Sequence, residues 1–387
     1  MTFKRIILIV LDSLGVGEAK DANIFNDLGA NTLGSLYNNT DVTFPNLEKM
    51  GLKNILTNQD SRTSAYYTYA EPTSVGKDTL TGHLELMGLI TTKPFKTFTK
   101  TGFPEDLVTA LEKETGHKFI GNCNASGTEI IKELGEQHMQ TKELILYTSA
   151  DSVMQIAAHE EVIPLDELYR VCEIARRLTL KDEWKVGRII ARPFIGTPGN
   201  FTRTSNRHDY ALNPAGKTVL DHLKDNHYDV ISIGKISDIF NNNGITESIK
   251  TKDNLDGINL IIKTLERDFN GLCFANLNDF DSKYGHRRNI SGYANCLLEF
   301  DNHLPHILNK LQDNDLLIIT ADHGNDPSYR DTDHTRENVP VLIYSKQFKE
   351  TKRIDALQTF SDIGATIASN FNVNKQSIGT NILDKLK

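Results

Sequence analysis

Residues 5–12 read Arg-Ile-Ile-Leu-Ile-Val-Leu-Asp, and residues 316–323 read Leu-Leu-Ile-Ile-Thr-Ala-Asp-His. Each stretch is a short apolar run, partly β-branched, that is followed at once or after one residue by an acid. Such runs are typical of strands that other elements cover on both faces. Because open α/β sheets bind their ligands at the carboxyl ends of the strands, we expect Asp12 and Asp322 to face one crevice.

Three further apolar runs predict strands at 228–233, 272–277 and 339–344. Helical patterns lie between the later strands. Residues 255–269 carry Leu and Ile at helical spacing before Gly271, and residues 291–311 have a similar pattern in which Pro305 should kink or break the helix. This alternation predicts an α/β fold with a mainly parallel central sheet and helices on both faces.

The middle of the chain, from about residue 95 to residue 213, has a different pattern. It combines two helical patterns and one apolar run, at 104–115, 165–178 and 144–148, with arginine-rich sequence after them. The 387 residues also exceed the roughly 250–300 at which a single core stops growing. We therefore expect a core domain at 1–94 and 214–387 and an inserted α+β cap domain at 95–213.

The composition is that of an ordinary globular protein, with 39% hydrophobic and 24% charged residues. A formal net charge of −8 gives no general attraction for polyanions, so nucleic acid is not expected as a partner. No apolar run approaches the ~20 residues of a membrane span, and the N-terminal run lacks a signal-peptide pattern. The widely spaced cysteines predict reduced core thiols in a cytoplasmic protein, at Cys123, Cys172, Cys273 and Cys296.

Aspartate and histidine gather after three of the predicted strands and before a fourth. The residues concerned are Asp12, Asp281, His286, Asp322, His323 and His334. Taken singly, an Asp after a strand is more often a turn or cap residue than a ligand. Together they form the carboxylate and imidazole set that manganese, zinc, iron or magnesium favours. Such a set can hold two divalent ions ~3.5–4 Å apart for an in-line phosphoryl displacement.

Residues 73–83 read Thr-Ser-Val-Gly-Lys-Asp-Thr-Leu-Thr-Gly-His. This is not a nucleotide-binding P-loop, because Asp78 occupies the Ser/Thr place and the preceding glycine is missing. Hydroxylic residues beside lysine and aspartate suit a turn that presents a hydroxyl to a phosphate, and a metal ion is needed to activate a threonine. Thr79 and Thr81 are both candidates for that nucleophile. The alternative is that either one only caps the next helix.

With these residues assembled, the sequence resembles the bacterial phosphopentomutase family of the alkaline phosphatase superfamily. The resemblance runs over essentially the whole chain, in the stretches 10–15, 76–79, 81–83, 149–153, 320–327 and 333–335, and in Asp281 with His286. Leu84 departs from the pattern, since members of the family often carry tryptophan there. No metal or phosphate ligand is lost by this departure.

The resemblance implies an alkaline-phosphatase-like core with the inserted cap. It assigns one metal ion to Asp12, Thr79, Asp322 and His323, and the other to Asp281, His286 and His334. Thr79 would carry the phosphate, because its spacing to Gly82 fits the family better than that of Thr81. Two Mn²⁺ ions and a bisphosphorylated sugar activator are the implied cofactors.

The implied substrates are small sugar phosphates, namely ribose 1-phosphate and ribose 5-phosphate and the 2-deoxyribose pair. By analogy to the family, the substrate-binding residues would be Ser149, Asp151, Arg188, Arg203 and Lys235. The alternatives are a cofactor-independent phosphoglycerate mutase-like enzyme, a metal-dependent phosphomonoesterase, or a metal-binding structural protein with a degenerate site. The sequence does not predict the oligomeric state.

Overall fold

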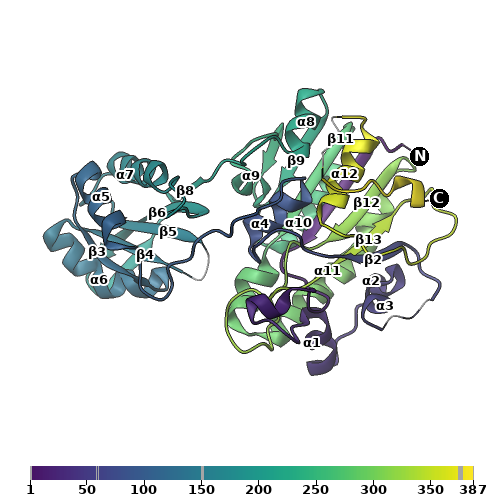
Figure 1. The fold of residues 1–387 in the computed structure, drawn as a ribbon, viewed down its shortest axis with the longest axis horizontal. Coiled ribbons are helices and arrows are strands. Elements are labelled where there is room, and N and C mark those ends of the chain that lie inside the picture. Colours follow the sequence, from purple (N-terminus) through teal and green to yellow (C-terminus); the bar gives the residue numbers. More distant parts are fainter. Residues whose placement is uncertain (1, 58, 60, 150–151, 374–377, 387) are drawn as a thin grey trace. The chain divides into compact units, whose positions relative to one another are not determined.

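The computed structural model describes residues 2–57, 59, 61–149, 152–373 and 378–386. It divides into two compact units (Figure 1). The large unit comprises Met1–Lys93 and Pro214–Lys387, and the small unit comprises Pro94–Asn213.

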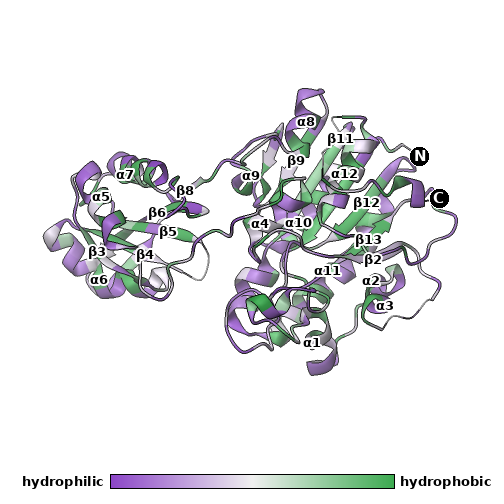
Figure 2. Ribbon diagram, in the orientation of Figure 1, coloured by the Kyte–Doolittle hydropathy of each residue, from purple (hydrophilic) through white to green (hydrophobic). Residues whose placement is uncertain are grey.

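The large unit is built on a seven-stranded sheet. In spatial order its strands are β10 (Glu247–Ile249), β9 (Asp229–Ile233), β11 (Gly271–Leu277), β1 (Arg5–Leu11), β12 (Asp315–Thr320), β13 (Val339–Tyr344) and β2 (Tyr66–Ala70). β13 runs antiparallel to both of its neighbours, β12 and β2, and the other four pairs are parallel, so the predicted mainly parallel sheet is confirmed. β1, β11 and β12 are buried along their whole length, and Figure 2 shows the strands of this sheet as mostly hydrophobic.

Helices cover this sheet in two groups. In the first group, α11 (Ile290–Lys310) packs against α1 (Thr32–Asn39), α2 (Pro45–Met50) and α10 (Asn254–Leu265). In the second group, α12 (Ser361–Asn370) packs against α4 (Thr79–Leu86) and α8 (Val219–Asp225), and α4 packs against α9 (Ile236–Ile239). The remaining helix, α3 (Leu52–Thr57), packs on β2 and β13. The α10 helix ends before the predicted residue 269, because the chain turns at 266–268 to enter β11.

Pro305 does not break its helix, since α11 continues through it to Lys310. Proline has no N–H to donate to the carbonyl of Asp301 one turn earlier. That carbonyl accepts a hydrogen bond from Asn46 Nδ2 at 2.9 Å instead. The Asp301 carboxylate also accepts from the backbone N–H groups of Asn46 and Leu47, at 3.2 and 2.7 Å, which ties the first turn of α2 to α11.

Replacing Asn46 by alanine is therefore expected to lower the free energy of unfolding by about 1–3 kcal/mol, because a buried carbonyl loses its partner. Urea denaturation measures the loss. The matched background is Pro305→Ala, in which residue 305 regains an N–H for Asp301. We expect Asn46→Ala to lower the free energy of unfolding less in the Pro305→Ala protein than in the wild type. An equal loss in both proteins would show that the Asp301 carbonyl is not the cause.

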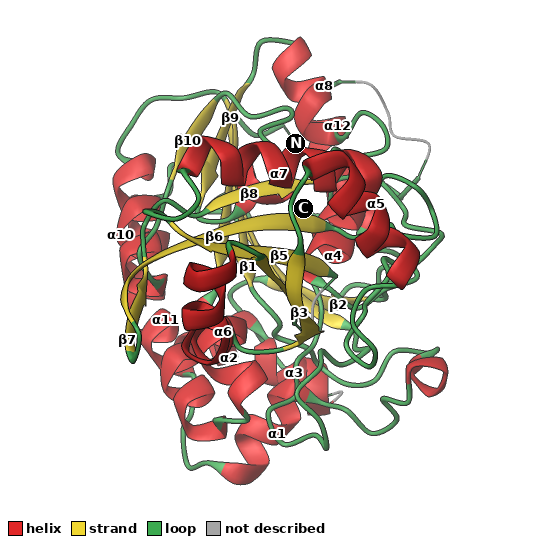
Figure 3. Cartoon of the chain, turned by 90° about the vertical axis from the view of Figure 1, so that its left-hand side faces the viewer, coloured by secondary structure: helices red, strands yellow, loops and turns green. Residues whose placement is uncertain are grey.

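The small unit has its own sheet and its own core. Its strands are β3 (Phe119–Asn124), β4 (Leu144–Thr148), β5 (Val153–His159), β6 (Arg188–Thr197) and β7 (Asn200–Arg203), with β8 (His208–Ala211) paired to β6. Parallel and antiparallel pairs alternate. One apolar cluster packs α5 (Glu105–Thr115) and α7 (Leu165–Leu178) against this sheet. A second, separate cluster packs α6 (Gly127–Thr141) against it. Figure 3 shows the resulting mixture of helices and strands.

All four cysteines are free. Three of them are buried as predicted, but Cys123 is exposed, because it lies in β3, at the edge of the small unit's sheet. Among the residues that the structure describes, no helix combines the length and the apolar character needed to cross a membrane.

Candidate metal centre

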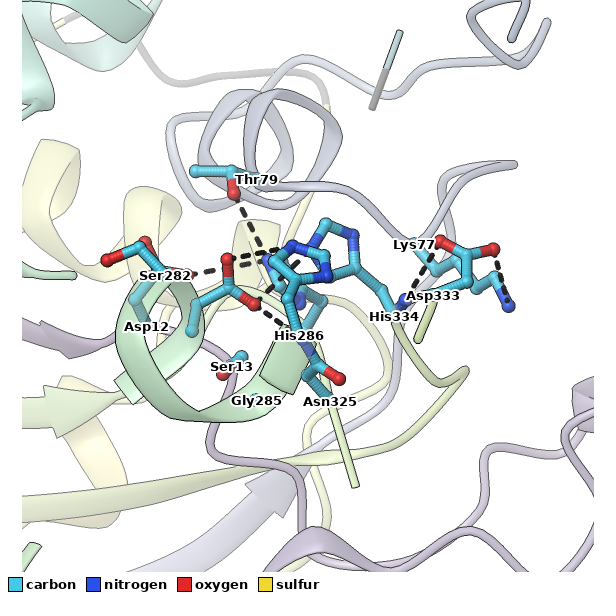
Figure 4. A network of polar contacts seen from close by, with 12 residues as sticks. Asp12, Ser13, Lys77, Thr79, Ser282, Gly285, His286, Asn325, Asp333 and His334 are labelled. Atoms are coloured by element: carbon cyan, nitrogen blue, oxygen red, sulfur yellow. Dashed lines mark hydrogen bonds and ion pairs between the residues drawn. The ribbon is translucent and has the colours of Figure 1, made fainter. Parts of the chain in front are cut away.

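Six of the predicted ligands lie together at the carboxyl end of the large sheet, in two groups of three, and Figure 4 labels Asp12, His286 and His334 among them. The first triad is Asp12, Asp322 and His323, which follow β1 and β12. The second triad is Asp281, His286 and His334, which come from the segments after β11 and before β13. In each triad one possible ligand atom per residue lies within 4.8 Å of the others.

In the first triad, three ligand atoms converge. His323 Nε2 lies 3.5 Å from Asp12 Oδ1 and 3.4 Å from Asp322 Oδ2. These two carboxylate oxygens are buried and accept no hydrogen bond from any described residue. His323 Nδ1 is 3.0 Å from the carbonyl of Gly324, so the ring donates there and keeps the lone pair of Nε2 free.

The second oxygen of each carboxylate in the first triad is held by the protein. Asn276 Nδ2 and Asn278 Nδ2 donate to Asp12 Oδ2 at 2.9 and 3.1 Å. The backbone N–H of Ser13 donates to Asp322 Oδ1 at 3.1 Å. Each acid is thus oriented through one oxygen and presents the other, which is the arrangement that a cation requires.

The first triad concentrates negative charge in a buried place. Burial, with the charges of Asp322 and Asp281, raises the pKa of Asp12 to about 6. Burial alone would lower the pKa of His323, but the charges of Asp322 and Asp12 outweigh it and raise that pKa to about 9. Unpaired carboxylate oxygens in a buried site are costly unless an ion compensates them, so these residues fit a divalent metal ion.

The second triad is organised in the same way. Asp281 Oδ2 lies 3.2 Å from His286 Nε2, and Asp281 Oδ1 lies 3.4 Å from His334 Nε2. His286 Nδ1 is 2.7 Å from the carbonyl of Thr332, and the Nε2 atoms of His286 and His334 are 3.1 Å apart, so both turn the same ring nitrogen toward Asp281. Burial would raise the pKa of Asp281, but the two imidazoles outweigh it and hold that pKa well below its usual value. The ring centroids of His323 and His334 are 4.1 Å apart, so the two triads are neighbours.

Thr79 is the first residue of α4, and its Oγ1 lies 3.2 Å from His323 Nε2 (Figure 4). The helix cap is neither Thr79 nor Thr81 but Asp78, which accepts from the Thr81 N–H at 3.0 Å and from its hydroxyl at 2.6 Å. A Cβ on Gly82 would lie 2.0 Å from the carbonyl oxygen of Asp322, so only glycine allows α4 this close to the first triad.

The predicted substrate residues lie in both units. In the small unit, Ser149 follows β4, and Arg188 Nη1 is 3.8 Å from Asp209 Oδ2. Arg203 ends β7 and is exposed. Asp151 lies outside the described residues.

Lys235 belongs to the large unit, where it precedes α9. Its charge lowers the pKa of Asp12, which places it within electrostatic reach of the first triad.

Several residues that support the triads had no predicted role. Asn276 and Asn278 are spaced by two, so they project to one side where β11 ends, and this spacing is a signal that could have identified them. Asn325 and Arg288 carry no such signal. Asn325 Nδ2 donates to Asp281 Oδ1 at 2.7 Å, and Arg288 Nη1 donates to Asn325 Oδ1 at 2.6 Å.

His83 also had no predicted role. Its Nδ1 lies 2.8 Å from the carbonyl of Thr79 and 3.1 Å from Asp322 Oδ2, and the hydrogen bond goes to the carbonyl. His83 thereby connects the start of α4 with the first triad.

The two triads at the end of this α/β sheet fit an enzyme that binds metal ions. The chain belongs to the Metalloenzyme superfamily, whose family model matches residues 4–375.

Among solved structures, PH0037 protein from Pyrococcus horikoshii is 14% identical, with a TM-score of 0.51 and coverage of 96% of this chain and 98% of that one. Leishmania mexicana phosphoglycerate mutase is 10% identical, with a TM-score of 0.50 and 98% coverage of both chains. An alkaline phosphatase superfamily protein from Vibrio parahaemolyticus is 14% identical, with a TM-score of 0.47 and coverage of 99% of this chain and 70% of that one.

Chelation is expected to lower the thermal midpoint of unfolding, and added Mn²⁺ to restore it, because an ion that binds only the folded state stabilises it by about 2.7 kcal/mol at 100 times its Kd. Differential scanning calorimetry measures the shift. His286→Ala should reduce the gain from Mn²⁺, whereas His306→Ala, at an exposed histidine of α11, should not. Equal gains in both variants would argue against the second triad as a metal site.

Proposed function

We propose that this chain is a phosphopentomutase that interconverts ribose 1-phosphate and ribose 5-phosphate, and the 2-deoxyribose pair, through phosphorylated Thr79. The observation that carries the proposal is the position of the Thr79 hydroxyl, 3.2 Å from the Nε2 atom on which the first triad converges. Thr79 also begins α4, where the N-terminal backbone N–H groups of a helix favour a phosphate.

One metal ion would be held by Asp12, Thr79, Asp322 and His323, and the other by Asp281, His286 and His334. When bound, the two ions neutralise charge on the transferring phosphoryl group and polarise the threonine oxygen. The protein's part is to hold the nucleophile and the ligand atoms in fixed positions before the substrate arrives. The amides of Asn276, Asn278 and Asn325 serve this purpose by orienting two of the carboxylates.

The reaction starts from the phosphorylated enzyme. The free 5-hydroxyl of ribose 1-phosphate attacks the phosphorus on Thr79, the bond between phosphorus and Oγ1 breaks, and the hydroxyl proton leaves for Oγ1. After the resulting ribose 1,5-bisphosphate reorients, the Thr79 hydroxyl attacks its C1 phosphate, the bond between phosphorus and O1 breaks, the threonine proton goes to O1, and ribose 5-phosphate is released. No phosphate is consumed in a cycle, so a bisphosphorylated sugar is needed only to prime Thr79.

The phosphate that does not react must be bound apart from the metal ions. We assign Arg188 and Arg203 to it, Ser149 and Asp151 to the sugar hydroxyls, and Lys235 to the core side of the substrate. The grouping of guanidinium groups supports the assignment, since after burial the charges of Arg207 and Arg203 act on Arg192 and lower its pKa to about 10.

We further propose that the small unit acts as a cap that keeps water away from phosphothreonine while the bisphosphate reorients. Removal of residues 94–213 should then abolish mutase activity and raise the hydrolysis of phosphorylated Thr79. A deletion that left both rates unchanged would contradict the role of the cap.

The test of the function is direct. The enzyme is supplied with Mn²⁺ and ribose 1,5-bisphosphate, and the formation of ribose 5-phosphate from ribose 1-phosphate is followed beside assays with 3-phosphoglycerate and a simple aryl phosphate. We expect turnover of the pentose phosphate to exceed the other two activities. Preferential turnover of 3-phosphoglycerate would replace the proposal by a phosphoglycerate mutase-like function, and broad hydrolysis would replace it by a phosphomonoesterase.

A further inference from the structure

We infer that Arg336 is a positioning residue that fixes the nucleophile loop, residues 72–78, relative to the two triads. The inference rests on the proposed function only in taking Thr79, which follows this loop, as the nucleophile. Arg336 is 2% exposed and comes two residues after His334 of the second triad.

The guanidinium of Arg336 binds both ends of the nucleophile loop. Nη1 donates to the carbonyl of Gly76 at 2.5 Å, and Nη2 donates to the carbonyl of Pro72 at 3.1 Å. Two backbone N–H groups of the loop go to another buried side chain, since Thr73 and Ser74 donate to the carboxylate of Glu85 at 2.9 and 2.7 Å. Arg336 thus binds two carbonyls of the loop, and Glu85 binds two of its amides.

The orientation of the Arg336 guanidinium is itself fixed. Nε and Nη2 donate to the two oxygens of Asp21, both at 2.9 Å, and the group lies 4.7 Å from the ring centre of Phe25. A lysine could not make this set of contacts, because its single ammonium cannot span two carbonyls and a bidentate carboxylate. Arginine at this position therefore fixes the loop in one geometry.

The backbone around Arg336 joins the nucleophile loop to the metal centre. The Arg336 N–H donates to Asp27 Oδ2 at 2.8 Å, and the same oxygen accepts from Lys77 Nζ at 2.9 Å. The next residue, Glu337, accepts from the Thr32 N–H at 2.8 Å and the Thr335 hydroxyl at 2.6 Å.

Glu337 also lies against the loops that carry the first triad. A Cβ on Gly15 or Gly324 would lie 2.1 or 2.5 Å from its carboxylate oxygens. Successive residues of one extended segment thus contact the metal-ligand loops and the nucleophile loop, and Arg336 is the link between them.

The chain contains a matched control for Arg336. Arg5, at the start of β1, is 1% exposed and makes the same kinds of contact. It donates to both oxygens of Asp315 at 2.8 and 2.5 Å and to the carbonyls of Leu265 and Arg267 at 3.0 and 2.8 Å, and it lies 5.1 Å from the ring of Phe269. Since Asp12 follows the other end of β1, Arg5 lies at the opposite edge of the sheet from the triads.

The test compares Arg336→Lys with Arg5→Lys in the full chain. Hydrogen exchange followed by mass spectrometry reports on residues 72–78 without reference to activity. Kinetics report the rate of Thr79 phosphorylation by ribose 1,5-bisphosphate, and calorimetry reports Mn²⁺ affinity. We expect Arg336→Lys to speed amide exchange in the loop and to slow phosphorylation by up to about 100-fold, as for a nucleophile displaced by about 1 Å. Its Mn²⁺ affinity should fall less than the phosphorylation rate, because the carboxylate and imidazole ligands keep their positions and only the Thr79 oxygen shifts.

Arg5→Lys should lose thermal stability to a similar degree and leave loop exchange and phosphorylation unchanged. Equal effects of the two substitutions on loop exchange and on phosphorylation would overturn the inference, since Arg336 would then act only through general stability. If Arg336→Lys does not fold, the same exchange and phosphorylation measurements are made on Asp21→Asn. That substitution loosens the guanidinium of Arg336 while residue 336 itself stays arginine. If the wild type forms no phosphothreonine, the proposed function fails, whereas the exchange data still decide whether Arg336 positions the loop.

Discussion

Replacement of Thr79 by valine is expected to abolish phosphoryl transfer, with a fall in kcat/KM of at least about 1,000-fold. Valine keeps the shape of the side chain and removes only the hydroxyl that lies 3.2 Å from His323 Nε2. No other acceptor can then receive the phosphate, so the loss should appear in kcat and not in substrate affinity. Steady-state assays with ribose 1-phosphate, together with single-turnover phosphorylation, measure both quantities.

Thr81→Val is the matched control, because Thr81 is the neighbouring hydroxyl and the rival nucleophile by chemistry. Its Oγ1 donates to Asp78 Oδ2 at 2.6 Å and is 2% exposed, so it serves the helix cap. We expect a modest loss of stability, about 1 kcal/mol, and retained transfer. An inactive Thr81→Val beside an active Thr79→Val would reassign the nucleophile.

The second large effect is expected from Asp12→Asn. The new side chain keeps an oxygen for Asn276 and Asn278, but it replaces the unpaired Oδ1 by an N–H group that points at the position of the ion. Loss of the negative charge and of the ligand atom should weaken metal binding by more than about 100-fold. Transfer should fall by about 100- to 1,000-fold. Metal analysis of the purified protein and titration calorimetry test the first expectation.

Asp362→Asn provides the control for that substitution. Asp362 is also a buried acid, and it accepts from the backbone of Gln358 and Thr380 near the start of α12, away from the triads. The amide oxygen of asparagine can accept only one of these two bonds, so stability should fall. Metal content should nevertheless not change, because Asp362 belongs to neither triad. If Asp12→Asn bound two ions as tightly as the wild type, the first triad would not be a metal site.

The elements that sequence reasoning predicted well are those with local causes. The buried strands β1, β12 and β13 follow from short apolar runs, and the acids that end β1 and β12 then lie at one edge of the sheet. The antiparallel direction of β13 was not predicted, because direction depends on how the chain returns from β12 and not on the composition of the strand.

The features that were missed depend on contacts between distant segments. Pro305 is tolerated because Asn46, far away in the chain, satisfies the carbonyl that proline leaves free. Arg336 looks like an ordinary charged residue in the sequence, and only the folded chain shows that it binds Pro72 and Gly76. The assigned roles of the triads, of Thr79 and of the substrate residues remain predictions for the experiments above.

The central claim is that Thr79 carries the phosphate during turnover. The most direct measurement is to incubate the Mn²⁺-loaded enzyme with ribose 1,5-bisphosphate, stop the reaction, digest the protein and map phosphate by mass spectrometry. With isotopically labelled bisphosphate, the account predicts labelled phosphate on Thr79 in the wild type, transfer of that label to C5 of the sugar when ribose 1-phosphate is added, and no phosphate in Thr79→Val. Phosphate on a different residue, or turnover without any phosphorylated enzyme, would contradict it.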